Sequence, residues 1–136
     1  EGVAAMSAGT QELVVEIPSS EWLTSNQRLH PMAKAARTKA LRRRAWGLSR
    51  AHLHPIIGPA LVVAESHYRT GRGLDADACA PSVKACLDGM TDAGIWEDDS
   101  GKYVGGVLYQ ASRRDNTLRT GWHAIRLLII DQWVGF

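Results

Sequence analysis

The 136-residue sequence has few cysteines and no long apolar segment, and each shortage excludes a class of protein. Its two cysteines, Cys79 and Cys86, have neither the C-x-x-C spacing nor the neighbouring histidines of a zinc site, so we expect none. Two such thiols also give no sign of an oxidising compartment. No segment approaches the ~18 consecutive apolar residues of a membrane helix, and no signal-peptide pattern occurs. We therefore expect a soluble, cytoplasmic protein with no membrane partner.

Acidic residues are absent from residues 22–64, although the net charge of the whole chain is only +2. The acids are concentrated in residues 75–99, which hold seven acids and one lysine. A solvent-exposed helix face usually carries charges of both signs. A purely basic segment followed by an acidic one therefore favours a phosphodiester ligand. The alternative is that the basic residues form an ordinary solvent-exposed surface. The side chains expected to hold such a backbone are Arg28, Lys34, Arg37, Lys39, Arg42 and Arg43, with Arg69 and Arg72 at the entrance to the acidic segment.

Two aspartates, Asp75 and Asp77, stand two positions apart in a segment predicted to be extended, where both carboxylates would face the same side of the chain. A helix predicted over residues 81–93 would span ~20 Å and then reverse the chain. If the fold permits, Asp98 and Asp99 would return beside the first pair. Carboxylates without clustered histidine or cysteine form an all-oxygen site that suits Mg²⁺, with Mn²⁺ as a substitute. A metal there would activate water and polarise a phosphoryl oxygen.

One basic residue, Lys84, stands alone between Arg72 and Lys102. It lies one helical turn before Asp88, so one interpretation is a surface ion pair. The other interpretation is a cation directed at a scissile phosphate. The sequence leaves both open.

Four runs in this region follow the pattern of a known family: Leu74-Asp75-Ala76-Asp77, Pro81-Ser82-Val83-Lys84-Ala85, Asp88-Gly89-Met90-Thr91-Asp92-Ala93-Gly94 and Asp98-Asp99. Together they resemble RusA-type Holliday junction resolvases, which are small, homodimeric, Mg²⁺-dependent endonucleases often encoded by phages and prophages. The resemblance covers roughly residues 11–130. It implies that Asp75, Asp77 and Asp99 hold the metal and that Lys84 completes the catalytic site. This chain departs from the family at Ala78, where members commonly carry asparagine.

The periodicity of apolar residues predicts a single α+β domain over residues 11–136, preceded by a disordered tail of residues 1–10 whose part before Met6 is not expected to be native. We expect the order β-α-β-α-β-β, a mixed sheet with two main helices packed on it, which is also what the RusA resemblance implies. The predicted strands are 12–18, 60–68, 103–110 and 122–130, the last two paired antiparallel, and the predicted helices are 30–52 and 81–93.

Several side-chain environments follow from the same patterns. The connection of residues 22–28 is expected either to cap the first helix or, by the resemblance, to lie near the active site. Cys86 is expected in the core, and Cys79 as a partly exposed thiol. Residues 113–120 are predicted to form a polar connection, and residues 131–136 either to cover a groove, to contact another subunit or to be disordered. The apolar stripe predicted for the first helix is Ala33, Ala36, Ala40, Leu41 and Leu48, with Trp46 as a core anchor rather than a stacking group.

Three functions remain open from the sequence. The first is a Mg²⁺-dependent endonuclease that cuts four-way DNA junctions as a homodimer, because two sites related by a twofold axis would nick opposing strands symmetrically. The second is a non-catalytic protein that binds branched DNA, for which Ala78 is the sequence feature. The third is a domain whose acids hold a purely structural metal ion. Junction binding separates the third from the others, and cleavage with Mg²⁺ separates the first from the second.

Overall fold

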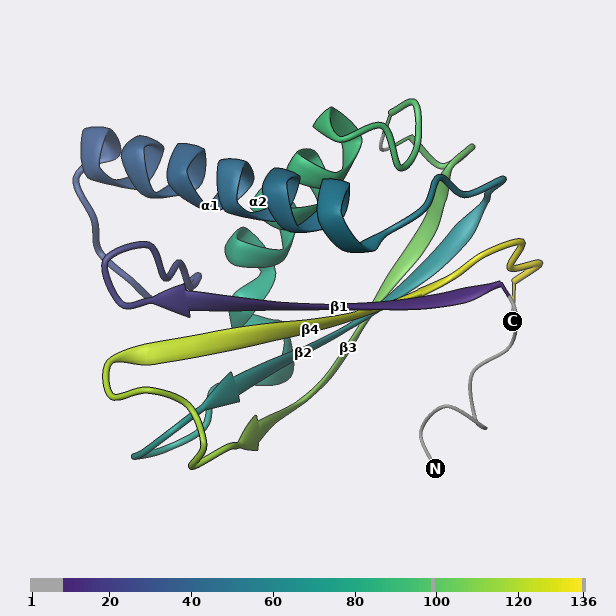
Figure 1. Ribbon diagram of the computed structural model, residues 1–136. Helices are drawn as coiled ribbons and strands as arrows, with labels where there is room; N and C mark the ends of the chain where they lie inside the picture. Colours follow the sequence, from purple (N-terminus) through teal and green to yellow (C-terminus); the bar gives the residue numbers. More distant parts are fainter. Residues whose placement is uncertain (1–8, 99, 136) are drawn as a thin grey trace.

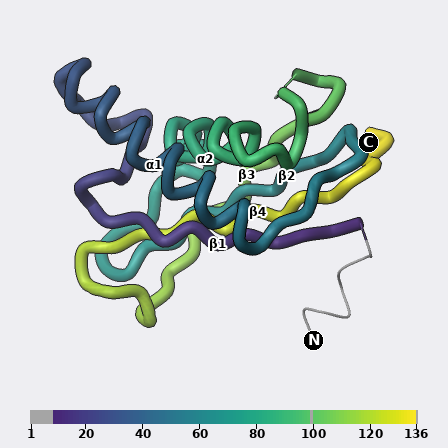
Figure 2. The backbone as a smooth tube through the Cα atoms, turned by 45° about the horizontal axis from the view of Figure 1, so that its top comes forward, coloured from purple at the N-terminus to yellow at the C-terminus, as the bar shows by residue number. Residues whose placement is uncertain are grey.

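The computed structural model describes residues 9–98 and 100–135. Their order is β-α-β-α-β-β, with one short 3₁₀ helix before the second α-helix, so the predicted α+β domain with a mixed sheet is confirmed. Both helices lie on one face of the sheet (Figures 1 and 2). The elements are β1 (Thr10–Pro18), α1 (Pro31–His52), β2 (Ala60–Tyr68), η1 (Ala76–Cys79), α2 (Ala80–Asp92), β3 (Val104–Arg114) and β4 (Trp122–Ile130).

The sheet has the strand order β1-β4-β2-β3, with β2 and β3 parallel and the other two pairs antiparallel. The predicted hairpin between the last two strands is therefore wrong, because β2 lies between them. Burial explains the order: β2 is buried along most of its length, whereas β3 is mostly exposed or half-buried and carries two glycines. An apolar strand gains most from a central position, and a strand with glycines and polar residues suits an edge. β3 also continues through Arg113 and Arg114, which were expected in a connection.

The core lies between the sheet and the two helices. Leu13, Val15 and Ile17 alternate toward it along β1, as the period of two predicts. Cys86 is fully buried in α2, as expected, but Cys79 is fully buried as well, so its predicted partial exposure is wrong. No helix within the described residues is long and apolar enough to cross a membrane.

The buried face of α1 differs from the predicted stripe. Leu41, Ala45 and Ser49 are the fully buried residues of this helix, a row spaced four residues apart. The predicted Ala33 and Ala36 are exposed, together with the rest of the first six residues of the helix. Trp46 is 44% exposed, so the expectation that it anchors the core is wrong. The helix has this orientation because its backbone packs directly against Gly89 of α2, where a side chain would collide with the carbonyl oxygen of Arg42.

The C-terminal segment folds back onto the sheet. The backbone N–H of Trp133 donates to the carbonyl oxygen of Pro59 at 2.9 Å. The indole of Trp133 lies against Gly105 and Gly106 of β3, where a β-carbon would come within about 3.0–3.5 Å of the ring. The described part of this C-terminal tail is therefore packed on the sheet, where Trp133 covers the two glycines of β3.

Candidate functional site

Of the two aspartates of the D-x-D motif, only Asp75 has extended backbone angles, whereas Asp77 lies in a short 3₁₀ helix. Asp75 precedes η1 and Asp77 lies within it, and the N–H of Ala78 donates to the carbonyl oxygen of Asp75 at 3.0 Å. The prediction that both carboxylates face the same side assumed an extended chain from Asp75 to Asp77, and this assumption is wrong. The turn buries Ala78 and Cys79 and leaves both aspartates exposed to solvent. Exposed carboxylates on one short turn retain the oxygen donors that Mg²⁺ prefers.

The motif rests on the edge strand β3. The Ser112 hydroxyl donates to the carbonyl oxygen of Leu74 at 3.0 Å and so fixes the residue before the first acid. Tyr109 lies on the same strand, and its pKa is raised chiefly by burial and further by the neighbouring Cys79 and Asp77. Tyr109 is thus a neighbour of the motif that the sequence did not single out. Little in the sequence indicated this role, because Tyr109 is only one of several apolar residues in a predicted strand.

Residues 22–28 lie beside the motif, which is where the resemblance placed them. The N–H of Ser25 donates to the carbonyl oxygen of Ala78 at 2.9 Å. Ser82 at the start of α2 is fully buried and bonds twice to Leu23, accepting from its N–H at 3.0 Å and donating to its carbonyl oxygen at 2.7 Å. Residues 22–28 were alternatively predicted to cap the first helix. That cap is formed by His30 instead, whose side chain accepts from the N–H of Met32 at 3.1 Å. Ser82 is therefore a positioning residue that sequence reasoning missed.

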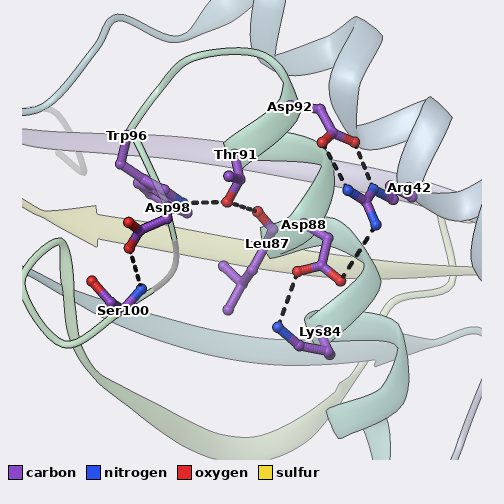
Figure 3. Close-up of polar contacts among 9 residues, drawn as sticks. All are labelled: Arg42, Lys84, Leu87, Asp88, Thr91, Asp92, Trp96, Asp98 and Ser100. Carbon is purple, nitrogen blue, oxygen red and sulfur yellow. Dashed lines mark hydrogen bonds and ion pairs between the residues drawn. The ribbon is translucent and has the colours of Figure 1, made fainter.

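Lys84, Asp88 and Asp92 of α2 form a row of ion pairs with one another and with Arg42 of α1 (Figure 3). Lys84 donates to Asp88 at 3.0 Å, one helical turn away, which is the predicted surface ion pair. Arg42 of α1 lies 4.0 Å from the same Asp88 and binds Asp92 through two hydrogen bonds of 2.6 and 2.8 Å. These bonds lower the pKa of Asp92. Asp88 thus lies between two cations, and the ion pairs join the face of α2 to α1.

The acids after α2 are placed by a buried anchor. The Trp96 indole is buried and donates to the Thr91 hydroxyl at 2.7 Å (Figure 3). Asp98 then turns back on its own chain and accepts from the N–H of Ser100 at 2.8 Å. The Ser100 hydroxyl, followed by this N–H, lowers the pKa of the Asp98 carboxyl, as does Lys102 to a smaller extent. Among the described residues no three His, Cys, Asp or Glu side chains form a metal site, so Asp98 does not complete one with the D-x-D motif. Asp99, the third predicted ligand, lies outside the described residues.

Some of the predicted phosphate-binding cations also hold the fold together. One guanidinium nitrogen of Arg37 donates to the carbonyl oxygens of Ser19 and Trp22, both at 2.9 Å. Arg69 donates to the carbonyl oxygen of Leu118 at 2.8 Å. These contacts, with the pairing of Arg42 described above, reduce the number of cations available to a ligand. In the part of the chain that the structure describes, no ion pair is found for Arg28, Lys34, Lys39, Arg43 or Arg72.

Four of these cations, Arg28, Lys34, Lys39 and Arg43, line two adjoining depressions. The first has a volume of about 340 Å³ and lies between residues 23–29 and the start of α2, with Arg28 and Lys34 in its wall. The second is an open groove of about 930 Å³ along α1, where Lys34, Lys39, Arg43 and Trp46 form much of the lining. Because Lys34 borders both, the two form one basic track, which begins at the loop bonded to Ala78.

A half-buried histidine beside a small cavity near Arg72 leads to a prediction of how the stability of the fold depends on pH. His123 stacks on Trp22, with ring centroids 4.5 Å apart, and burial lowers its pKa. The unfolded chain therefore binds a proton first, near pH 6.5, and the unfolding free energy should decline as the pH falls through this value. We expect His123→Gln to flatten this dependence between about pH 7.5 and 5 in urea titrations. His54→Gln, at an exposed position, is the control and should keep the wild-type slope; an unchanged slope in His123→Gln would contradict the assignment.

Comparison of the chain with protein-family models and with curated proteins finds no match.

Proposed function

We propose that this protein is a Mg²⁺-dependent, structure-selective endonuclease that cuts four-way DNA junctions, as RusA-type resolvases do. One observation carries the proposal: the D-x-D motif lies at the end of a basic track. The hydrogen bond between Ser25 and Ala78 joins the motif to the loop, and Arg28 and Lys34 continue from that loop into the α1 groove. A phosphodiester substrate needs this combination, because cations hold the backbone while acids hold the metal that promotes cleavage.

The roles of the acids follow from their donor atoms. Asp75 and Asp77 would hold Mg²⁺, or Mn²⁺ in its place, together with Asp99. Asp98 is less suited to be the third ligand, because its carboxylate already binds the N–H of Ser100. When bound, the metal supplies an activated water and polarises a phosphoryl oxygen. Lys84 on the exposed face of α2 would stabilise the charge that develops on the phosphate, in exchange for its pairing with Asp88.

A homodimer suits this substrate, and we propose it as the acting form. A four-way junction has twofold symmetry, and two copies related by the same symmetry would place nicks on opposing strands. Paired nicking is what converts a junction into two separate duplexes, each with one nick, so a site in each of two copies matches the two cuts.

A second candidate function is binding of branched DNA without cleavage. The observation in its favour is Ala78, which is 2% exposed directly after the second acid of the motif. Its methyl group is buried beneath η1 and offers no polar atom to a metal, a water or a phosphate. If the asparagine that is common in the family contributes to turnover, this chain would retain the track and lose the reaction.

The deciding experiment is cleavage of a labelled synthetic four-way junction beside a linear duplex of the same sequence, with Mg²⁺ or with EDTA. Symmetric nicking of the junction alone, dependent on Mg²⁺, would support the endonuclease. Tight junction binding with no nicking would favour the second function, and Ala78→Asn would then be the next protein to assay. Failure to bind either DNA would contradict both and leave a structural role for the acids.

The basic track predicts how junction affinity depends on salt. Each phosphate contact contributes about 0.9 to the slope of log affinity against log salt, so Arg28→Ala/Lys34→Ala should reduce the slope by nearly 2. Arg50→Ala removes an exposed cation of α1 outside the two depressions and is the control, with little expected change. The measurement is a binding titration at several salt concentrations. An unchanged slope in the double variant would exclude the track as the phosphate-binding surface.

A further inference from the structure

Trp46 is exposed in a way that the other tryptophans of the chain are not. Trp22 and Trp96 are 6% and 3% exposed. Trp122 is covered by Arg119, whose guanidinium carbon lies 3.7 Å from the ring centroid, and Trp133 covers the glycines of β3. Trp46 is 44% exposed and lines the groove along α1. An indole left in solvent forgoes the large apolar burial that a tryptophan usually provides in a core, so its presence here needs another explanation.

The groove around Trp46 is positively charged. Its lining includes four cations, Lys34, Lys39, Arg42 and Arg43, and a single acid, Asp92. The carboxylate of Asp92 accepts two hydrogen bonds from Arg42 and is thereby neutralised (Figure 3). Lys39, Arg43 and Trp46 follow one another at four and three residues along α1, so they share one face of the helix. The indole and the unneutralised cations are therefore presented to the same ligand.

We propose that Trp46 is a stacking platform for an unpaired nucleobase, and that the α1 groove binds a single-stranded stretch of nucleic acid. The cations of the groove would follow the phosphates while one base stacks on the indole, the combination by which proteins hold single strands without reading their sequence. The base must be unpaired because the faces of paired bases are covered by their neighbours in a duplex. This inference rests on the proposed function and adds to it a subsite for a strand opened near the branch point.

Charge disfavours another copy of this chain as the occupant. Two α1 grooves facing each other would bring like charges together, which is destabilising. An acidic peptide would match the cations but has no flat aromatic surface to place on the indole unless it carries an aromatic residue of its own. A nucleotide strand supplies both the negative charge and the flat ring at every position.

The test is equilibrium binding of two labelled probes of equal length, oligo-dT and a strand of abasic nucleotides, to wild type and three variants. Trp46→Ala should weaken oligo-dT binding by about 5- to 160-fold, the range for loss of one stacked base. The same variant should bind the abasic strand as wild type does, because the phosphate contacts remain. Trp46→Phe should retain most of the affinity for oligo-dT. Ile57→Ala removes another exposed apolar side chain, 71% exposed and outside the groove, and should have no effect.

The outcomes test the stacking platform separately from the proposed function, except for the last, which tests both. If wild type binds and nicks the junction while Trp46→Ala binds oligo-dT normally, the stacking platform is excluded and the endonuclease stands. Equal wild-type affinity for oligo-dT and the abasic strand would exclude it as well. Competition by polyglutamate as strong as by oligo-dT would make the groove a site for acidic peptides. Failure of wild type to bind any DNA would overturn both proposals.

Discussion

Asp77→Asn should abolish Mg²⁺-dependent cleavage of four-way junctions and leave junction binding intact or stronger. The amide keeps the size of the carboxylate but loses the charge that holds the metal, and the loss should be at least about a hundredfold in rate, as for other removals of transition-state electrostatics. Asp77 is exposed on η1, so the substitution should not disturb the fold. Removing a negative charge near a polyanion favours binding. The measurements are the cleavage rate with Mg²⁺ and junction affinity in EDTA.

The matched control is Glu16→Gln, which removes one exposed carboxylate on β1, paired with Arg119 at 3.6 Å. It should cut at the wild-type rate. If Asp75→Asn and Asp77→Asn both also cut at that rate, the D-x-D motif does not hold a catalytic metal. Loss of junction binding together with cleavage in Asp77→Asn would instead indicate a role of this acid in DNA binding.

Gly89→Ala should destabilise the fold strongly although it places a better helix former in α2. An added Cβ would collide with the carbonyl oxygen of Arg42 and lie 2.9 Å from both the Cβ of Ala45 and the backbone nitrogen of Trp46. Backbone atoms of a packed helix cannot move aside independently, so α1 and α2 would have to separate. We expect the collision to cost about 3–4 kcal/mol, so that after the roughly 1 kcal/mol gained in helix propensity the unfolding free energy falls by about 2–3 kcal/mol. Urea denaturation at neutral pH measures this difference.

The same chain contains a glycine in the opposite situation. Gly47 lies in α1, and a methyl group added there would meet no atom within 4 Å, so Gly47→Ala should raise the unfolding free energy by about 0.5–1 kcal/mol. A gain from both substitutions would mean that the helices do not approach as closely as described. Because Gly89 sets which face of α1 is buried, its replacement should also weaken DNA binding by reorienting the groove.

Local patterns in the sequence were sufficient to predict most of the secondary structure. The bounds of β2 and β4 are those predicted, and α1 begins at Pro31 within one residue of its expected start. Gly94, with a φ of +83°, lies just beyond α2 at the expected stop. These features depend on the local period of apolar residues and on the backbone preferences of proline and glycine, so they can be predicted without knowing what lies opposite.

Only the tertiary structure determined which strands and helix faces contact one another. Adjacency along the chain predicted a hairpin of β3 with β4, but the most apolar strands took the centre of the sheet. The orientation of α1 depends on the close approach at Gly89, which no pattern within α1 encodes, and this left Trp46 exposed. Arg42 and Asp92 are 50 residues apart, so their pairing was equally out of reach. Local sequence was sufficient to predict which residue types form the candidate site. Which residues lie next to them depends on long-range packing, where the absence of one side chain, at Gly89, determines which face of α1 is buried.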